Sequence, residues 1–281
     1  MSPRAATLAG FGAVGLWSAL ALLTTMAGGL PPFQLLAMGF AVGGALGLAR
    51  GWPRGVPWGA WALGVGGLWG YHLLYVLALR LAPPVEASLI AYLWPLLVVL
   101  GSATVARLRW FHVAGAGLGL AGAAIVVAGG QGLALRPAPG HALALLAAFV
   151  WAGYSVLSRR YARVPSSAVT GFCLAAALLS GLAHLALEET VAPRGAEWAA
   201  VLALGLGPLG AAFFLWDVGV KRGDLAVLGA GSYAAPLLST LVLVAAGLAA
   251  PSWSLAAACA LIAGGAALAA REMLGAKAQA R

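Results

Sequence analysis

A few aromatic and polar residues stand in the middle of long apolar segments, and they are the residues of this sequence best suited to bind a small molecule. Aromatic rings stack on planar groups, while phenol, indole and imidazole groups also form hydrogen bonds. They predict an aromatic pocket, with packing of the interior as the alternative interpretation. At 1.5 Å of rise per helical residue, the residues near mid-depth are Trp17, His72, Tyr75, Tyr92, Trp94 and Trp151.

His72 is the histidine nearest the middle of a segment, because the other three lie near segment ends. His72 and Tyr75 are one helical turn apart and therefore share a face. An imidazole at this depth either packs with a hydrogen bond or takes part in the pocket, with Tyr75 or Tyr92 as its partner.

Two acidic residues lie within apolar segments. Glu86 stands about 5 Å into its segment, where a carboxylate can be hydrated. It is a candidate charge site for a substrate ammonium or a proton, and an ion pair with Arg80 is the alternative. Asp217 precedes Lys221 by four residues, a spacing that predicts an ion pair on one helix. Neither acid lies at the centre of its segment, so the sequence does not support obligatory coupling to protons.

Composition identifies the solvent of these segments. Of the 281 residues, 63% are hydrophobic and 8% are charged, and the mean hydropathy is +0.97. Soluble proteins carry about 25% charged residues, so this chain must lie in a bilayer. Each segment is near the ~20 residues that cross the hydrocarbon core as a helix. An all-α membrane protein with ten transmembrane helices is therefore predicted, at about 5–27, 31–49, 57–79, 83–106, 110–130, 140–158, 166–187, 196–220, 224–249 and 252–270.

The basic residues give the chain an orientation. When alternate connections are assigned to opposite sides, thirteen Lys and Arg residues share the side of the N-terminus and three lie on the other side. The positive-inside rule then places both termini in the cytoplasm. This sidedness accounts for the net charge of +9 without a nucleic acid partner. The thirteen are Arg4, Arg50, Arg54, Arg107, Arg109, Arg159, Arg160, Arg163, Lys221, Arg222, Arg271, Lys277 and Arg281, and the three are Arg80, Arg136 and Arg194.

The two halves of the chain align with each other. Residues 15–33 align with 149–167, and residues 69–97 align with 210–238. Because each half holds five segments, an odd number, the second half must enter from the opposite face. The sequence thus predicts an inverted five-plus-five repeat, with domains at 1–132 and 138–275. The aligned pairs are Trp17 with Trp151, Pro31 with Pro165, His72 with Phe213, Tyr75 with Trp216, Arg80 with Lys221, Tyr92 with Tyr233, Pro95 with Pro236 and Trp110 with Trp253.

This architecture, with a proline late in the fourth and ninth segments, resembles the drug/metabolite transporter superfamily and, within it, the EamA-type exporters. The stretch YLWPLL at 92–97 and the tryptophans that open the fifth and tenth segments are similar to the branch that exports aromatic and other neutral amino acids. The second half reads YAAP at 233–236 in place of YLWP, so the pocket is expected to be imperfectly symmetric. Phe213, Trp216 and Tyr233 complete its predicted lining.

Pro95 and Pro236 are expected to act as hinges. A proline removes one helical hydrogen bond and can kink the helix, which a bilayer tolerates only against other helices or a water-filled cavity. Pro95 lies about 18 Å deep, and Pro236 occupies the matching position in the other half. Kinked helices at related positions mark a midplane site or gate, whereas a proline that only shapes packing is the alternative.

The predicted function is export of a neutral, aromatic or large apolar, amino acid across the inner membrane. The protein would act as a monomer in the lipid bilayer, by alternating access and without a cofactor or a metal. Other small metabolites or drugs (nucleobases, sugars, cationic compounds) and a membrane protein that transports nothing are the alternatives. An enzyme is not expected, because the sequence contains no HExxH, GxSG or Walker A motif. Cys173 and Cys259 lie in apolar segments and predict no disulfide.

Overall fold

The computed structural model describes residues 1–49, 51–128, 137–248, 250 and 252–271, and all regular structure in these residues is helical. Polar side chains begin some helices by accepting from free backbone N–H groups, as the Ser2 hydroxyl does at α1 and the Asp224 carboxylate at α13. The α-helices are α1 (Pro3–Trp17), α2 (Leu20–Met26), α3 (Pro32–Leu48), α4 (Trp58–Val65), α5 (Tyr71–Leu81), α6 (Pro84–Ala91), α7 (Trp94–Gly101), α8 (Trp110–Ala128), α9 (Pro139–Leu157), α10 (Ala168–Leu187), α11 (Ala196–Leu206), α12 (Ala212–Arg222), α13 (Leu225–Gly231), α14 (Ala234–Ala245) and α15 (Trp253–Ala269).

Eight helical segments in the described part of the chain are long and apolar enough to cross a membrane, and two further apolar helices, α3 and α15, are shorter. Each of these ten overlaps one of the segments expected from the sequence. The chain is accordingly a multi-pass integral membrane protein. The eight are Pro3–Met26, Trp58–Leu81, Pro84–Thr104, Trp110–Val127, Pro139–Tyr161, Ala168–Leu187, Ala196–Arg222 and Leu225–Ala245.

Some of the expected features lie outside the described residues. They include four of the basic residues used to orient the chain, namely Arg50, Arg136, Lys277 and Arg281, and the last residues of both predicted domains, 129–132 and 272–275.

Five of the long segments are interrupted, more than the two kinks expected from the prolines. The segment of α1 and α2 breaks at Ser18 and Ala19, that of α6 and α7 at Tyr92 and Leu93, and that of α13 and α14 at Ser232 and Tyr233. Pro95 and Pro236 lie just after the last two breaks, in the first turn of a new helix, where proline is tolerated.

The other two interruptions are π-helical turns, η1 (Gly66–Gly70) between α4 and α5, and η4 (Gly207–Ala211) between α11 and α12. Three of the five residues of η1 are glycines, and η4 contains two glycines and a proline. A π turn has i→i+5 hydrogen bonds, so it accommodates an extra residue and is frequent at functional sites.

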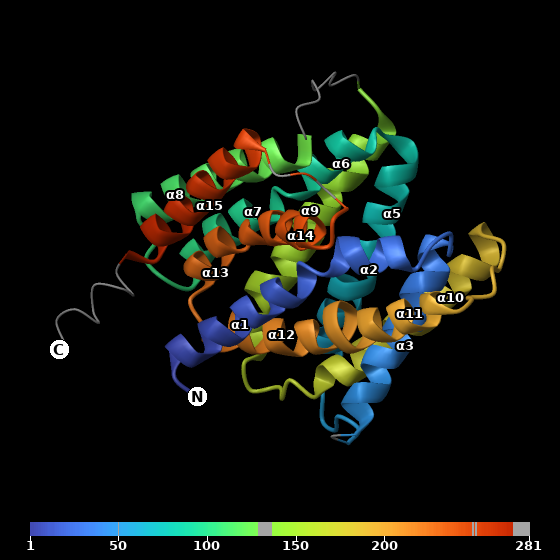
Figure 1. The fold of residues 1–281 in the computed structure, drawn as a ribbon. Coiled ribbons are helices and arrows are strands. Elements are labelled where there is room, and N and C mark those ends of the chain that lie inside the picture. Colours follow the sequence, from blue (N-terminus) through green and yellow to red (C-terminus); the bar gives the residue numbers. More distant parts are fainter. Residues whose placement is uncertain (50, 129–136, 249, 251, 272–281) are drawn as a thin grey trace.

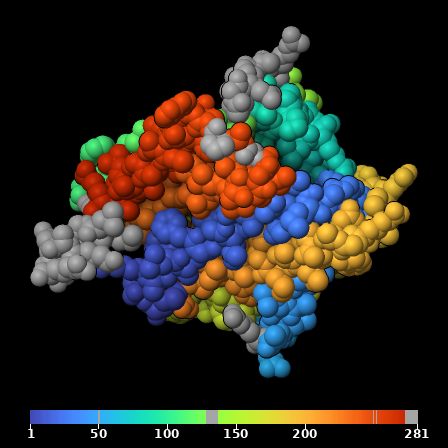
Figure 2. Space-filling model, in the orientation of Figure 1, coloured from blue at the N-terminus to red at the C-terminus, as the bar shows by residue number. Residues whose placement is uncertain are grey.

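Helices from the two halves of the chain pack against each other throughout the molecule. α1 packs on α12, α3 on α10, α5 on α9 and α8 on α15 (Figure 1). Figure 2 shows α1 and α2 as a blue band across one face, between segments of the second half. The contact of α8 with α15 requires glycine, because a Cβ on Gly115 of α8 would lie 2.5 Å from the carbonyl oxygen of Gly265 in α15.

A buried carboxylate joins three helices at one end of the bundle. Glu188, which follows α10, accepts hydrogen bonds of 3.1 Å from the backbone N–H groups of Phe33 and Gln34 at the start of α3. It also forms an ion pair with Arg80 at the end of α5, and lies 3.0 Å from Nδ1 of His184. We call this side, where α2 ends and α3 begins, the α2–α3 end.

The ion pairs differ partly from expectation. Arg80 pairs with Glu188, so the alternative pairing of Arg80 with Glu86 was wrong; an oxygen of Glu86 instead lies 2.9 Å from Nε2 of His141. The expected pair of Asp217 and Lys221 forms at 2.9 Å, and both side chains are buried. It lies at the opposite side of the bundle, which we call the α12–α13 end.

Candidate functional site

A cavity of about 590 Å³ lies where the interrupted segments meet, and it contains most of the predicted pocket residues. Seven of the nine predicted substrate-binding residues line it: Trp17, His72, Tyr75, Tyr92, Trp94, Trp151 and Phe213. The other lining residues are Leu20, Ala21, Thr24, Thr25, Leu35, Leu36, Tyr71, Ala91, Leu204, Leu209, Ala235 and Ser239.

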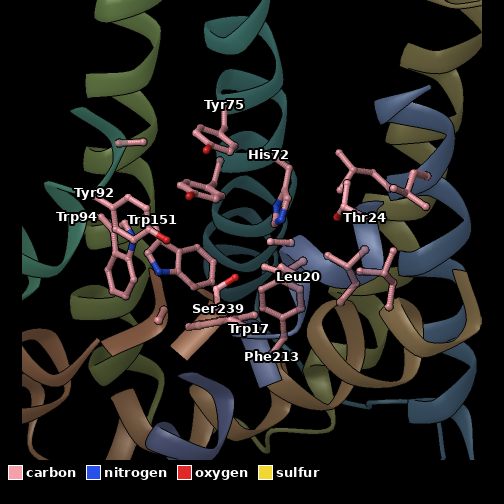
Figure 3. A pocket seen from close by; sticks show the side chains of 18 of the residues that line it. Trp17, Leu20, Thr24, His72, Tyr75, Tyr92, Trp94, Trp151, Phe213 and Ser239 are labelled. Carbon is pink, nitrogen blue, oxygen red and sulfur yellow. The ribbon is translucent and has the colours of Figure 1, made fainter. Parts of the chain in front are cut away.

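The cavity has one polar aromatic side and one aliphatic side. Tyr71, His72 and Tyr75 come from α5, and Trp151 comes from the neighbouring α9. Leucines supply an aliphatic part of the wall: Leu20 from α2, Leu35 and Leu36 from α3, Leu204 from α11 and Leu209 from η4. In Figure 3, Tyr92, Trp94 and Trp151 lie on one side and Thr24 on the other, with Trp17 and Phe213 at the bottom of the view. Among the described residues that line the cavity, none is Asp, Glu, Lys or Arg.

Trp17 is the centre of an aromatic layer beneath the cavity. Its ring centroid lies 6.5 Å from that of Trp94, 5.7 Å from Trp151, 6.0 Å from Phe213 and 5.2 Å from Trp216. Its indole N–H donates a hydrogen bond of 3.1 Å to the carbonyl of Pro208 in η4. This bond holds the π turn of the second half against the break in the first segment.

Some polar groups of the cavity wall form hydrogen bonds within the protein, and others form none with the described residues. Nδ1 of His72 lies 2.6 Å from the carbonyl oxygen of Leu68, and since a carbonyl only accepts, Nδ1 carries the proton and Nε2 of the neutral ring can accept. The Tyr75 hydroxyl bonds that of Ser88 at 3.0 Å. Within the described residues the hydroxyl of Tyr92 has no hydrogen-bond partner, and neither does the indole N–H of Trp94.

Trp216 and Tyr233, predicted as pocket residues, lie behind the cavity wall, and both are 0% exposed. Trp216 stacks on Trp151 and donates its indole N–H to the Ser155 hydroxyl at 3.1 Å. The hydroxyl of Tyr233 accepts from the backbone N–H of Leu96 at 3.2 Å. Glu86, the candidate charge site, does not line the cavity; nor do Pro95 and Pro236.

Tyr71 is the aromatic lining residue that sequence reasoning missed. It stacks on Tyr75, with the rings 5.8 Å apart and nearly parallel. Its place four residues before Tyr75 indicates the same helix face as surely as the spacing of His72, so the signal was present. The lining leucines carry no comparable signal, because lipid-facing leucines have the same surroundings in the sequence.

The cavity lies toward the α2–α3 end. Thr24 and Thr25 stand near the end of α2, and Leu35 and Leu36 near the start of α3. The aromatic layer closes the cavity below. Further contacts join the elements at the α12–α13 end: Lys221 donates to the Val164 carbonyl at 3.0 Å, the Asp224 N–H donates to the Thr7 hydroxyl at 2.9 Å, and Arg159 donates to the Gly223 carbonyl.

Comparisons with known proteins agree on one family. The EamA-like transporter family matches residues 4–128 and 138–271. The chain is 57% identical to the aromatic amino acid exporter YddG of Ancylobacter novellus, over 96% of this chain and 98% of that protein. It is 28% identical to the exporters of the same name from Salmonella typhimurium and Escherichia coli, in each case over 85% of this chain and 88% of the relative. A crystal structure of a protein 56% identical in sequence has the same fold, with a TM-score of 0.91 and coverage of 95% of this chain and 99% of the other.

Proposed function

The chain belongs to the EamA-like transporter family, and on that premise we propose that it exports neutral amino acids with aromatic or large apolar side chains. The observation that carries this proposal is the uncharged cavity with one polar aromatic side and one aliphatic side. The relatives named as aromatic amino acid exporters support the same substrate class.

The arrangement of the cavity suits a zwitterion with an apolar side chain. Nε2 of His72 can accept from the ammonium group, and the hydroxyl of Tyr92 can donate to the carboxylate. The leucine wall and the Trp17 layer suit the side chain, which they can bury against apolar and aromatic surface. A cationic compound would enter a cavity without a lining carboxylate, so the cavity favours neutral substrates.

The proposal includes ten membrane spans arranged as an inverted repeat of residues 1–132 and 138–275. A π turn in the third and the eighth segment, and a break before a proline in the fourth and the ninth, support it. In the repeat, α1 corresponds to α9 and α12 corresponds to α5. The packing of α1 on α12 therefore has a counterpart in the packing of α9 on α5, and both are present. Both termini would lie in the cytoplasm; reporters fused after Arg281 and at Gly195 should then read cytoplasmic and periplasmic, and any other pattern contradicts the topology.

Transport would proceed by alternating access in the inner membrane. The cavity toward the α2–α3 end and the aromatic layer beneath it suit one of two states, in which the layer separates the substrate from the other side. Pro95 and Pro236 would act as hinges that let the halves of their segments move separately.

Uptake into liposomes containing the purified protein tests the proposed substrate. A panel should compare radiolabelled phenylalanine, tryptophan and leucine with a nucleoside, a sugar and a cationic drug. We expect protein-dependent flux of the three amino acids, with Trp253→Ala as a control because that residue is 92% exposed and does not line the cavity. Flux of the nucleoside, the sugar or the drug in preference to every amino acid would overturn the proposal.

A further inference from the structure

Tyr92 and Tyr233 occupy matching positions in the two halves but have different surroundings. Each lies at the break of its segment, one before Pro95 and the other before Pro236. Tyr92 lines the cavity, and its hydroxyl has no partner in the described residues. Tyr233 is fully buried, and its ring leaves no room for a side chain on Gly119, where a Cβ would meet Cδ2 of Tyr233 at 2.6 Å.

The hydroxyl of Tyr233 satisfies a backbone group that the break leaves free. The first N–H groups of a helix have no acceptor within that helix. At the start of α7, Leu97 donates to Leu93, Pro95 has no N–H, and Leu96 donates to the Tyr233 hydroxyl at 3.2 Å. A residue of the second half thus caps the broken segment of the first half.

Among the described residues, the matching cap is absent from the other half. Leu237 corresponds to Leu96, and in the described residues no side chain accepts a hydrogen bond from its backbone N–H. Ala235 and Ser239, on either side of Leu237, line the cavity. The break of the second half therefore borders the open cavity, whereas Tyr233 reaches the break of the first half in the closed interior.

A second set of matching residues differs in burial in the same way. Trp216 donates to Ser155 between α12 and α9. The counterparts of these residues in the other half are Tyr75 and Ala21, and both line the cavity. Trp216 and Ser155 are thus buried on the closed side of the aromatic layer, whereas Tyr75 and Ala21 border the open cavity; Ala21 has no hydroxyl, so the difference between the two pairs is one of burial alone.

We propose that Tyr92 and Tyr233 exchange roles between the two transport states, which makes Tyr233 a substrate-contacting residue of the state opposite to this one. There Tyr92 caps Leu237, Tyr233 releases Leu96, and the Tyr233 hydroxyl lines a cavity toward the α12–α13 end. The inference rests on the inverted repeat and alternating access proposed above. Because a buried N–H is costly to leave unpaired, the exchange keeps one cap in each state, and the pair favours neither.

Thiol labelling tests the exchange by reporting which side is open. Ser158 corresponds to Thr24, which lines the present cavity, but Ser158 itself is 3% exposed. A Ser158→Cys probe, in protein with Cys173→Ala and Cys259→Ala, should therefore react with a water-soluble maleimide only in the opposite state. The labelling rate of purified protein then measures the population of that state.

Removing one hydroxyl should shift the population in a direction set by the tyrosine. Tyr233→Phe removes the cap of the present state, so the labelling rate should rise by about twofold to tenfold, the effect of one net hydrogen bond. Tyr92→Phe removes the cap of the opposite state, so the rate should fall by a similar factor. The double variant should label at a rate close to that of the protein with both tyrosines.

Other patterns overturn the proposal. If Tyr233→Phe leaves the rate unchanged or lowers it, or if both single variants shift it the same way, the hydroxyls do not exchange. If Tyr233→Phe fails to fold, Gly119→Ala replaces it, since the added methyl group displaces the Tyr233 ring and should raise the rate without removing a hydroxyl. Labelling requires no substrate, so a liposome panel without amino acid flux would refute the proposed substrate and leave this result standing.

Discussion

The indole N–H of Trp216 donates a hydrogen bond of 3.1 Å to the hydroxyl of Ser155, and both residues are 0% exposed. The same hydroxyl donates to the Trp151 carbonyl at 2.8 Å. Ser155 thus links α12 to α9, the helix that also carries the cavity residue Trp151.

Ser155→Ala should destabilise the protein, because it leaves the buried N–H of Trp216 without an acceptor. The expected loss is about 1–3 kcal/mol of unfolding free energy, measurable by thermal unfolding in detergent. Ser180→Ala is the matched control: Ser180 is equally buried, but within the described residues its hydroxyl has no partner. Equal losses in the two variants would contradict the role given to the hydrogen bond.

Trp94→Ala and Tyr92→Ala should each reduce transport several-fold at unchanged expression. Both side chains line the cavity, and an aromatic contact contributes about 0.5–1.5 kcal/mol beyond the area that it buries. Liposome uptake measures the loss. Trp58→Ala and Trp253→Ala serve as controls, because those rings are 87% and 92% exposed; similar losses at all four positions would reduce the effect to general stability.

Pro95→Ala and Pro236→Ala should slow turnover while largely keeping substrate affinity. Alanine supplies an N–H just after each break, so the helical hydrogen bonds can continue across the break and stiffen the segment; gating is then impaired rather than binding. The measurement is kcat against KM for uptake, together with labelling of cysteines at Thr24 and Ser158. Wild-type turnover and labelling in both variants would mean that the prolines only shape packing.

Glu188→Ala should destabilise the α2–α3 end by about 2 kcal/mol, since it leaves two backbone N–H groups of α3 and the Arg80 guanidinium without their acceptor. Glu189→Ala is the control, because the neighbouring side chain is exposed. Thermal unfolding should separate the two variants, and an unchanged midpoint in Glu188→Ala would rule out a structural role for this carboxylate.

The sequence predicted the helical segments, because these follow from the length of apolar runs, and the same runs assign a depth to each candidate pocket residue. Depth alone does not give the direction of a side chain, however. Phe213 and Trp216 are one turn apart at similar depth, but Phe213 lines the cavity and Trp216 packs behind it. Their directions depend on the packing of α12 against α1 and on the π turn η4 that precedes it, neither of which hydropathy reports.

Ion pairs between residues far apart in the sequence were the second feature that the sequence did not predict. Arg80 and Glu86 are close in sequence and at similar depth, which suggested an ion pair. The fold instead brings Glu188 to Arg80 from 108 residues away, and sets Glu86 against His141 of α9. Such partners depend on which helices are neighbours, and a single sequence carries little information about that.

The π turn at Gly66–Gly70 has a consequence for comparing and redesigning this chain. An extra residue in a helix rotates everything after it by about 100°. Losing any one of these five residues would therefore turn Tyr71, His72 and Tyr75 out of the cavity wall without changing their identity. A homologue shorter by one residue here would align well and still present a different wall. Residues Gly66–Gly70, which are not among the described residues that line the cavity, thus set the direction of three residues that do line it.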